Sequence, residues 1–211
     1  MRITEPMTLV TDYLLGALAL ALAFRLFGAA GTGGQLSVRL WGIAFVMTAV
    51  AAVTGGTYHG FIEMVPASAG RLLWKITLIT TGFGSAALLG AAVLAAAAGT
   101  LQWVLLALVV LKLVVFVEVV LTRNNFLLVI LDYGSALLAV LLGAIFLRPT
   151  GLTPAAGWLA AGVAVSVVAG IVQAFRLAPH PRFNHNDLFH VIQMGALYLL
   201  YRGGLLLRDM R

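Results

Sequence analysis

The chain alternates long apolar stretches with short polar breaks along its whole length. Seven stretches reach the roughly 20 residues that a helix needs to cross the hydrocarbon layer of a bilayer: residues 7–27, 40–61, 72–97, 101–121, 126–147, 155–175 and 187–207. The breaks between them are rich in Gly, Pro and Asn, which favour turns. Because a spanning segment must satisfy its backbone hydrogen bonds internally, the pattern predicts an all-α bundle of seven transmembrane helices.

Composition supports a lipid-embedded chain. Of 211 residues, 62% are hydrophobic and only 9% are charged, whereas a soluble domain carries about 25% charged residues. The 13 Lys and Arg residues stand singly near the ends of apolar stretches, as in membrane proteins, and they form no patch with aromatic residues that would suit nucleic acid. No loop is long enough to fold separately. We therefore expect one transmembrane domain, residues 1–211, in a multi-pass integral membrane protein.

The acids and histidines are distributed unevenly between the two predicted membrane faces. We call side A the face that holds the N-terminus and the second, fourth and sixth breaks, and side B the opposite face. Intramembrane ionisable groups cost roughly 2.5–3.5 kcal/mol each and by default mark function. Side A therefore holds the predicted functional site. Six of the seven acids and all four histidines fall there: Glu5, Asp12, Glu63, Glu118, Asp132, Asp187, His59, His180, His185 and His190.

Two helices carry the strongest candidates. In the second stretch, His59 and Glu63 lie four residues apart and share a face if the helix continues to residue 64. The seventh stretch opens with a polar stripe at spacings of three and four: Asn186, Asp187, His190 and Gln193. Helix capping explains its first two members, but not the two that lie deeper. An inward-facing stripe opposite His59 is the sharper interpretation.

Four other charges have simpler partners or none. Lys75 and Glu118 lie at similar depth in the third and fourth stretches, which predicts a partly buried ion pair. Asp132 either pairs with Arg123 or joins the site. Lys112 falls near mid-membrane, where no acid lies at its depth, so it either extends toward the surface or lines a cavity.

The chain combines seven helices, a histidine late in the second helix and a histidine-bearing stripe at the start of the seventh. In these features it resembles the CREST superfamily, which includes alkaline ceramidases and the progestin and adipoQ receptors. Members carry Ser-x-x-x-His late in helix two, an Asp on helix two or three, and His-x-x-x-His at the start of helix seven. His59 and His190 match two of these histidines. Asn186 stands at the position of the third, with His185 one residue away, and Thr54 lies beside the serine position.

The resemblance implies a zinc-dependent membrane hydrolase that cleaves a lipid amide or ester near the bilayer surface, as a ceramidase does. Three histidines hold zinc in that family, and the zinc-bound water attacks the substrate. The candidate metal ligands here are His59, His190 and either His185 or Asp187. The candidate proton-transfer groups are the carboxylates Glu63, Asp187 and Asp12. The wider polar cluster contains Asn186, Gln193, Asp132 and Thr54.

A second interpretation is a non-enzymatic transporter or sensor that binds an ion, a proton or a small ligand at side A. An enzyme of this kind predicts a cavity that is closed toward side B and open laterally to membrane lipid. A transporter predicts polar residues at mid-membrane and a path to both faces. The middle of the chain offers only Lys112 and a few hydroxyls, which favours a one-sided site.

Overall fold

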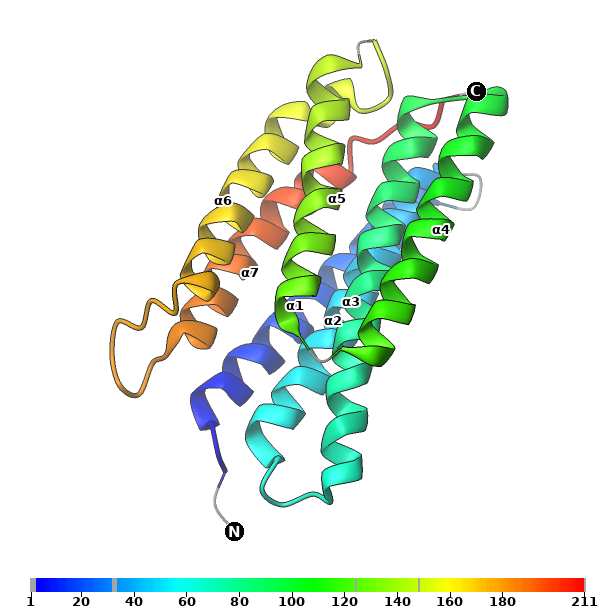
Figure 1. The fold of residues 1–211 in the computed structure, drawn as a ribbon. Helices are drawn as coiled ribbons and strands as arrows, with labels where there is room; N and C mark the ends of the chain where they lie inside the picture. Colours follow the sequence, from blue (N-terminus) through cyan, green and yellow to red (C-terminus); the bar gives the residue numbers. More distant parts are fainter. Residues whose placement is uncertain (1–2, 32–33, 124, 148, 211) are drawn as a thin grey trace.

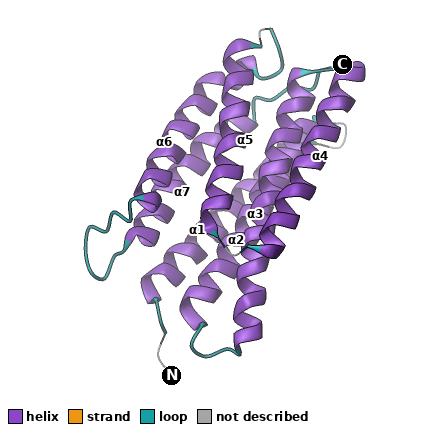
Figure 2. Cartoon of the chain, viewed as in Figure 1, coloured by secondary structure: helices purple, strands orange, loops and turns teal. Residues whose placement is uncertain are grey.

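The computed structural model describes residues 3–31, 34–123, 125–147 and 149–210, and over these residues the chain is all-α, as predicted. Short loops join the helices (Figures 1 and 2). The helices are α1 Pro6–Ala30, α2 Leu36–Phe61, α3 Ala67–Ala96, α4 Gly99–Thr122, α5 Phe126–Phe146, the short 3₁₀ helix η1 Thr153–Ala155, α6 Ala156–Ala174 and α7 His185–Gly204.

Helices α1 to α6 are long and apolar enough to cross a membrane, with η1 extending the sixth span to Thr153–Ala174. Helix α7 has 20 residues, but its polar stripe makes it less apolar than the others. The side chains of that stripe face the other helices rather than the surface: Asp187, His190 and Gln193 are all buried. The six apolar helices fit a multi-pass membrane protein.

Six helices form a closed ring in the order α1, α2, α3, α5, α6 and α7, because α7 packs against both α6 and α1. Helix α4 lies outside this ring and packs chiefly on α3 (Figure 1). Glycines permit close helix approach in such bundles. A Cβ at Gly56 would lie 2.7 Å from Asp12 Cβ, and one at Gly162 would lie 2.7 Å from Leu200 Cδ2. These contacts bring α1 against α2 and α6 against α7.

The segment after α7 closes the side B end of the bundle. The Asp209 carboxylate accepts hydrogen bonds from the backbone N–H groups of Leu36 and Ser37, at 2.6 and 2.9 Å, where α2 begins. The Met210 N–H donates to Leu94 O at 2.8 Å, near the end of α3. The first N–H groups of a helix have no partner within the helix, so the tail satisfies two of them while tying α2 to α3.

Candidate functional site

A buried acid–imidazole pair joins α1 and α7 at the side A end. His190 Nε2 lies 3.1 Å from Asp12 Oδ1, and the two residues are 8% and 4% exposed. The other ring nitrogen, Nδ1, lies 3.0 Å from Thr11 Oγ1, which also lies 3.1 Å from Thr8 O. The Thr11 hydroxyl has one hydrogen, so the imidazole tautomer decides whether that hydrogen goes to Thr8 O or to Nδ1. In either tautomer one proton lies between Asp12 and Nε2, and the two contacts fix the orientation of His190.

Asp187 holds the start of α7 against α1. Its Oδ1 accepts from the Thr8 hydroxyl at 2.8 Å, and its Oδ2 accepts from the Asn184 backbone N–H at 2.7 Å. Asn184 in turn caps the helix by accepting from the backbone N–H of Asp187, so the two residues form a capping box. Both oxygens of the predicted catalytic Asp187 are thus engaged in positioning α7.

His59 lies in the last turn of α2, beside this pair. Its Nδ1 is 3.3 Å from Glu5 Oε1, and Glu5 Oε2 lies 3.1 Å from Thr8 Oγ1. The imidazole meets the ring of Trp74 edge-on, with centroids 6.3 Å apart. His59 Nε2 has no hydrogen-bond partner among the described residues, which leaves that nitrogen available to a ligand.

A large cavity adjoins the three groups Asp12, His59 and His190. Its volume is about 590 Å³, within the range of roughly 300–1,000 Å³ that is typical of small-molecule sites. The walls come mainly from α2, α3, α5, α6 and α7 and are mostly apolar. Asn186 and Gln193 also line it, with Asn186 held by Gln173 at 3.0 Å. The side chain of buried Gln193 makes no hydrogen bond to a described residue, so its amide is available inside the cavity.

The cavity opens sideways between α5 and α6. Every exposed residue in its lining belongs to one of these two helices or to the end of α6: Gly134, Leu138, Val167, Ile171, Ala174 and Phe175. No exposed lining residue comes from the side B end, which the C-terminal tail covers. The opening therefore faces the direction in which lipid would surround a membrane-spanning bundle.

Several predicted residues lie away from the cavity. Helix α2 ends at Phe61, where the apolar stretch ends, and the continuation to residue 64 that His59 and Glu63 need to share a face does not occur. Glu63 is consequently exposed in the turn. His185 is the first residue of α7, and its side chain makes no hydrogen bond to a described residue. Thr54 binds the Thr77 hydroxyl at 2.9 Å, just behind the cavity wall.

Two predicted pairings of charges are wrong. Lys75 donates to the carbonyls of Val120 and Leu121, where α4 ends, and no ion pair joins it to Glu118 within the described residues. The last carbonyls of a helix have no partner within the helix, and lysine is a common donor to them. Asp132 pairs with Lys112 rather than with the site or with Arg123.

The side chains at the side A end of the cavity are of the types that bind zinc, but they are not arranged around a common point. Two imidazoles and a carboxylate, from His59, His190 and Asp12, face the cavity, and such donors are usual zinc ligands. Within the described residues, no three His, Asp or Glu side chains come close enough together to form a metal site. Both nitrogens of His190 bind protein atoms instead.

These features define a class: an all-helical bundle of membrane-spanning dimensions with a buried acid–imidazole pair at the side A end of a laterally open cavity. The chain belongs to the family of unknown function DUF6962, whose profile matches residues 7–209, from the start of α1 into the C-terminal tail. No curated protein and no solved structure matches the chain.

Proposed function

We propose that the protein is an integral membrane hydrolase that takes up a lipid between α5 and α6 and cleaves its amide or ester bond beside Asp12 and His190. One observation carries this proposal: a buried, proton-sharing pair lies at the side A end of an apolar cavity that opens toward lipid. Ionisable groups inside a membrane bundle are costly and usually functional. The apolar walls suit hydrocarbon, and the polar end suits a lipid linkage near the membrane surface.

The pair has the properties of a general acid–base catalyst. The Asp12 carboxylate can take a proton from an attacking water through its second oxygen and return it to the leaving group, while the contact with His190 Nε2 holds the carboxylate in place. Thr11 keeps the ring oriented through Nδ1. The amide N–H of Gln193 has no partner among the described residues and can donate to the carbonyl oxygen of the substrate, where negative charge develops during attack.

Zinc enters the proposal through the donor chemistry and the CREST resemblance. The donors that would hold it are His59, His190 and Asp12, and His190 would have to release one of its two protein contacts to do so. The metal would supply an activated water and polarise the carbonyl. His185 and Glu63, by contrast, do not line the cavity, so we do not include them among the zinc ligands or the catalytic groups.

The proposal is tested by reconstituting the protein in vesicles that contain a panel of lipid amides and esters and measuring released fatty acid. We expect turnover of at least one lipid class, reduced about 10²–10⁴-fold in Asp12→Asn and in His190→Gln, the range that general acid–base catalysis contributes. His180→Gln is the matched control, because His180 lies in the exposed loop before α7, and it should retain full activity. No hydrolysis of any lipid, or full activity in both site variants, would overturn the proposal.

A second candidate function is a non-catalytic lipid sensor, favoured by the fact that both nitrogens of His190 already bind protein atoms. Elemental analysis separates the two. Stoichiometric zinc that is lost in His59→Ala and in His190→Ala supports the zinc-dependent hydrolase. Metal-free protein that binds lipid without cleaving it supports the sensor. A transporter is disfavoured because the side B end is closed.

A further inference from the structure

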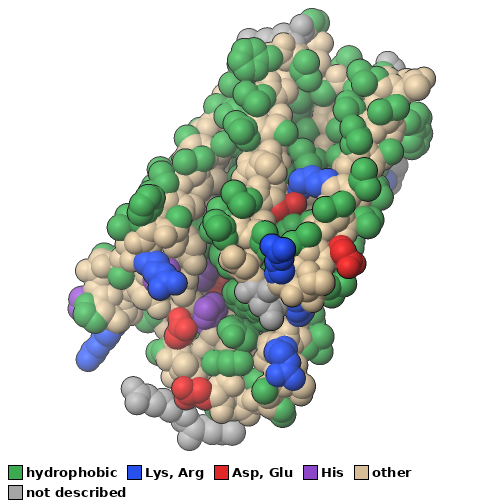
Figure 3. Space-filling view, in the orientation of Figure 1, with side chains coloured by type: hydrophobic (Ala, Val, Ile, Leu, Met, Phe, Trp, Pro, Cys, Tyr) green, Lys and Arg blue, Asp and Glu red, His purple; other side chains and the backbone are tan. Residues whose placement is uncertain are grey.

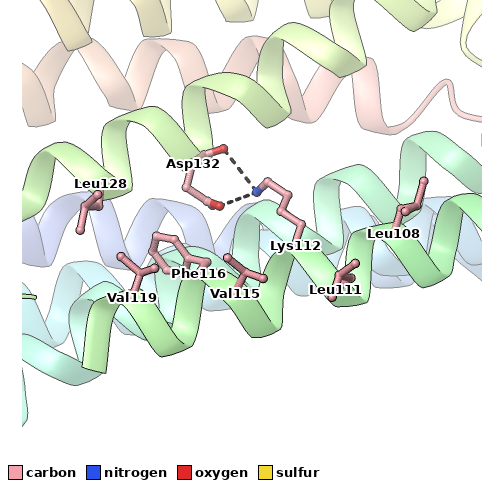
Figure 4. A pocket seen from close by; sticks show the side chains of 8 residues that line it. All are labelled: Leu108, Leu111, Lys112, Val115, Phe116, Val119, Leu128 and Asp132. Atoms are coloured by element: carbon pink, nitrogen blue, oxygen red, sulfur yellow. Dashed lines mark hydrogen bonds and ion pairs between the residues drawn. The ribbon is translucent and has the colours of Figure 1, made fainter. Parts of the chain in front are cut away.

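A second buried charge pair lies outside the site, where α3, α4 and α5 meet. Lys112 Nζ on α4 is 2.5 Å from Asp132 Oδ1 on α5 and 2.8 Å from Ser85 Oγ on α3. It also lies 3.5 Å from the backbone oxygen of Asp132 (Figure 4). The Asp132 side chain is 8% exposed and that of Lys112 is 29% exposed. One ammonium group thus joins three helices.

The pair forms the polar part of a groove of about 450 Å³ between α4 and α5. Figure 3 shows acidic and basic side chains set into an otherwise apolar stretch of this face. The remaining walls are apolar, and most belong to α4 (Figure 4): Leu108, Leu111, Val115, Phe116, Val119 and Leu128. Because the two helices are spread apart here, Lys112 spans a gap that side-chain packing does not close.

Helix α5 separates this groove from the cavity. With 3.6 residues per turn, its cavity-lining positions fall on one face: Val129, Ile130, Tyr133, Gly134, Leu137 and Leu138. Asp132 and Leu128 lie on the opposite face and line the groove. The contact of Asp132 with Lys112 therefore bears on α5, which forms both a cavity wall and one edge of the lateral opening.

A gain in folding stability does not explain why Lys112 and Asp132 are paired here. Apolar residues of similar volume often replace a buried ion pair without loss of stability, and in some proteins such pairs fix geometry instead. Only five α5 residues are buried in the described structure: Val129, Ala136, Leu137, Val140 and Ala144. Because so few α5 side chains pack in the interior, the ion pair between Asp132 and Lys112 contributes strongly to the position of this helix.

We propose that Lys112 is a positioning residue that holds α5 against α3 and α4 and thereby sets the width of the opening between α5 and α6. Without the tie, α5 relaxes over the cavity toward α6 and the opening narrows. A role of this opening in lipid entry rests on the proposed function. The effect of Lys112 on the position of α5 does not.

The chain contains no cysteine, so spin labels can be placed without background. Leu138 and Val167 are exposed residues on the two sides of the opening. We would label Leu138→Cys and Val167→Cys in vesicles and measure the distance distribution by pulsed electron paramagnetic resonance. Adding Lys112→Leu together with Asp132→Leu should shift the distribution to shorter distances and broaden it. The double replacement leaves no unpaired buried charge, and circular dichroism confirms that the protein remains folded.

Two variants sharpen the result. Lys112→Arg keeps a cation and should restore most of the parent distribution. Lys75→Leu is the matched control, since Lys75 also joins α3 to α4 but does not reach α5, and it should leave the distance unchanged. An unchanged distribution in the Leu double variant, or an equal shift in Lys75→Leu, would overturn the proposal. Because no substrate is present, this outcome is independent of whether the protein hydrolyses lipid.

Discussion

Two acid–base pairs lie inside this bundle, and they differ in partner and in surroundings. Asp12 meets an imidazole, a side chain that commonly takes part in proton transfer, and the pair faces a ligand-sized cavity. Asp132 meets an ammonium group in a shallow groove, with Ser85 completing the shell of the lysine. The first arrangement suits proton transfer, whereas the second suits a fixed tie. Burial of charge alone therefore does not identify a catalytic centre.

The largest difference between the pairs is expected when each acid is made neutral. Asp12→Asn should lower lipid hydrolysis about 10²–10⁴-fold. Asp132→Asn should change the turnover of a short-chain lipid by less than about tenfold, but it leaves Lys112 uncompensated. We expect it to lower the free energy of unfolding by roughly 3 kcal/mol, at the lower end of the usual range because Lys112 is partly exposed. Parallel measurements of turnover and chemical unfolding in detergent check both values, and equal turnover losses would erase the distinction.

The next effect concerns the close approach that places Asp12. Gly56→Ala puts a methyl group 2.7 Å from Asp12 Cβ, and overpacking of this kind costs about 1–3 kcal/mol. Displacement of Asp12 should also lower hydrolysis by about tenfold or more, since small misplacements are costly in catalysis. Gly157→Ala in α6 is the control, because a Cβ there meets nothing within 4 Å. Thermal unfolding and turnover that match the wild type in Gly56→Ala would contradict the close packing.

Blocking the lateral opening should act on entry without affecting stability. A Cβ added at Gly134 or at Gly170 meets nothing within 4 Å, and both positions line the cavity. Gly134→Phe with Gly170→Phe should weaken binding of a fluorescent lipid analogue by about tenfold, as expected for the loss of roughly 1.4 kcal/mol, with little change in melting temperature. Gly195→Phe, at another open and exposed glycine, should bind as the wild type does. Undiminished binding in the double variant would place the entrance elsewhere.

The smallest effect distinguishes a lysine cap from an ion pair. Lys75→Met should cost about 1 kcal/mol, because carbonyls at the end of α4 lose a charged donor. Glu118→Gln should leave the free energy of unfolding within about 0.5 kcal/mol of the wild type, as for most exposed substitutions. Chemical unfolding of both variants provides the comparison. Equal destabilisation would restore the pair that their similar depth suggested.

Apolar periodicity predicted the helices well, and the polar stripe of α7 led correctly to buried His190 and Gln193. The matching stripe on α1 was missed, although Glu5, Thr8 and Thr11 show the same spacing as the α7 residues. Of that stripe, only Asp12 was taken as a candidate for the site. Which residues meet across α1 and α7 depends on how the ring closes, and that arrangement has no local signal in the sequence.

Comparing the expected membrane depth of backbone positions also gave a wrong result for Lys112. It lies ten residues before the end of α4, and Asp132 lies six residues after the start of α5, which places their backbones about 6 Å apart in depth at 1.5 Å per residue. A lysine side chain covers that offset, so the two charges meet although their backbones do not. Matching by backbone depth therefore missed this pair and wrongly joined Lys75 to Glu118.

The central claim is that a lipid occupies the cavity and reaches Asp12 and His190. Photoaffinity labelling tests it most directly, with a lipid amide that carries a diazirine beside its linkage, incorporated into the vesicles that hold the protein. Mass spectrometry should find the label on cavity residues of α6 and α7, near Gln173, Phe189 and Gln193. That labelling should disappear when Gly134→Phe and Gly170→Phe block the opening. Labelling confined to α4 and the outer faces of the helices, unchanged by the block, would contradict the account.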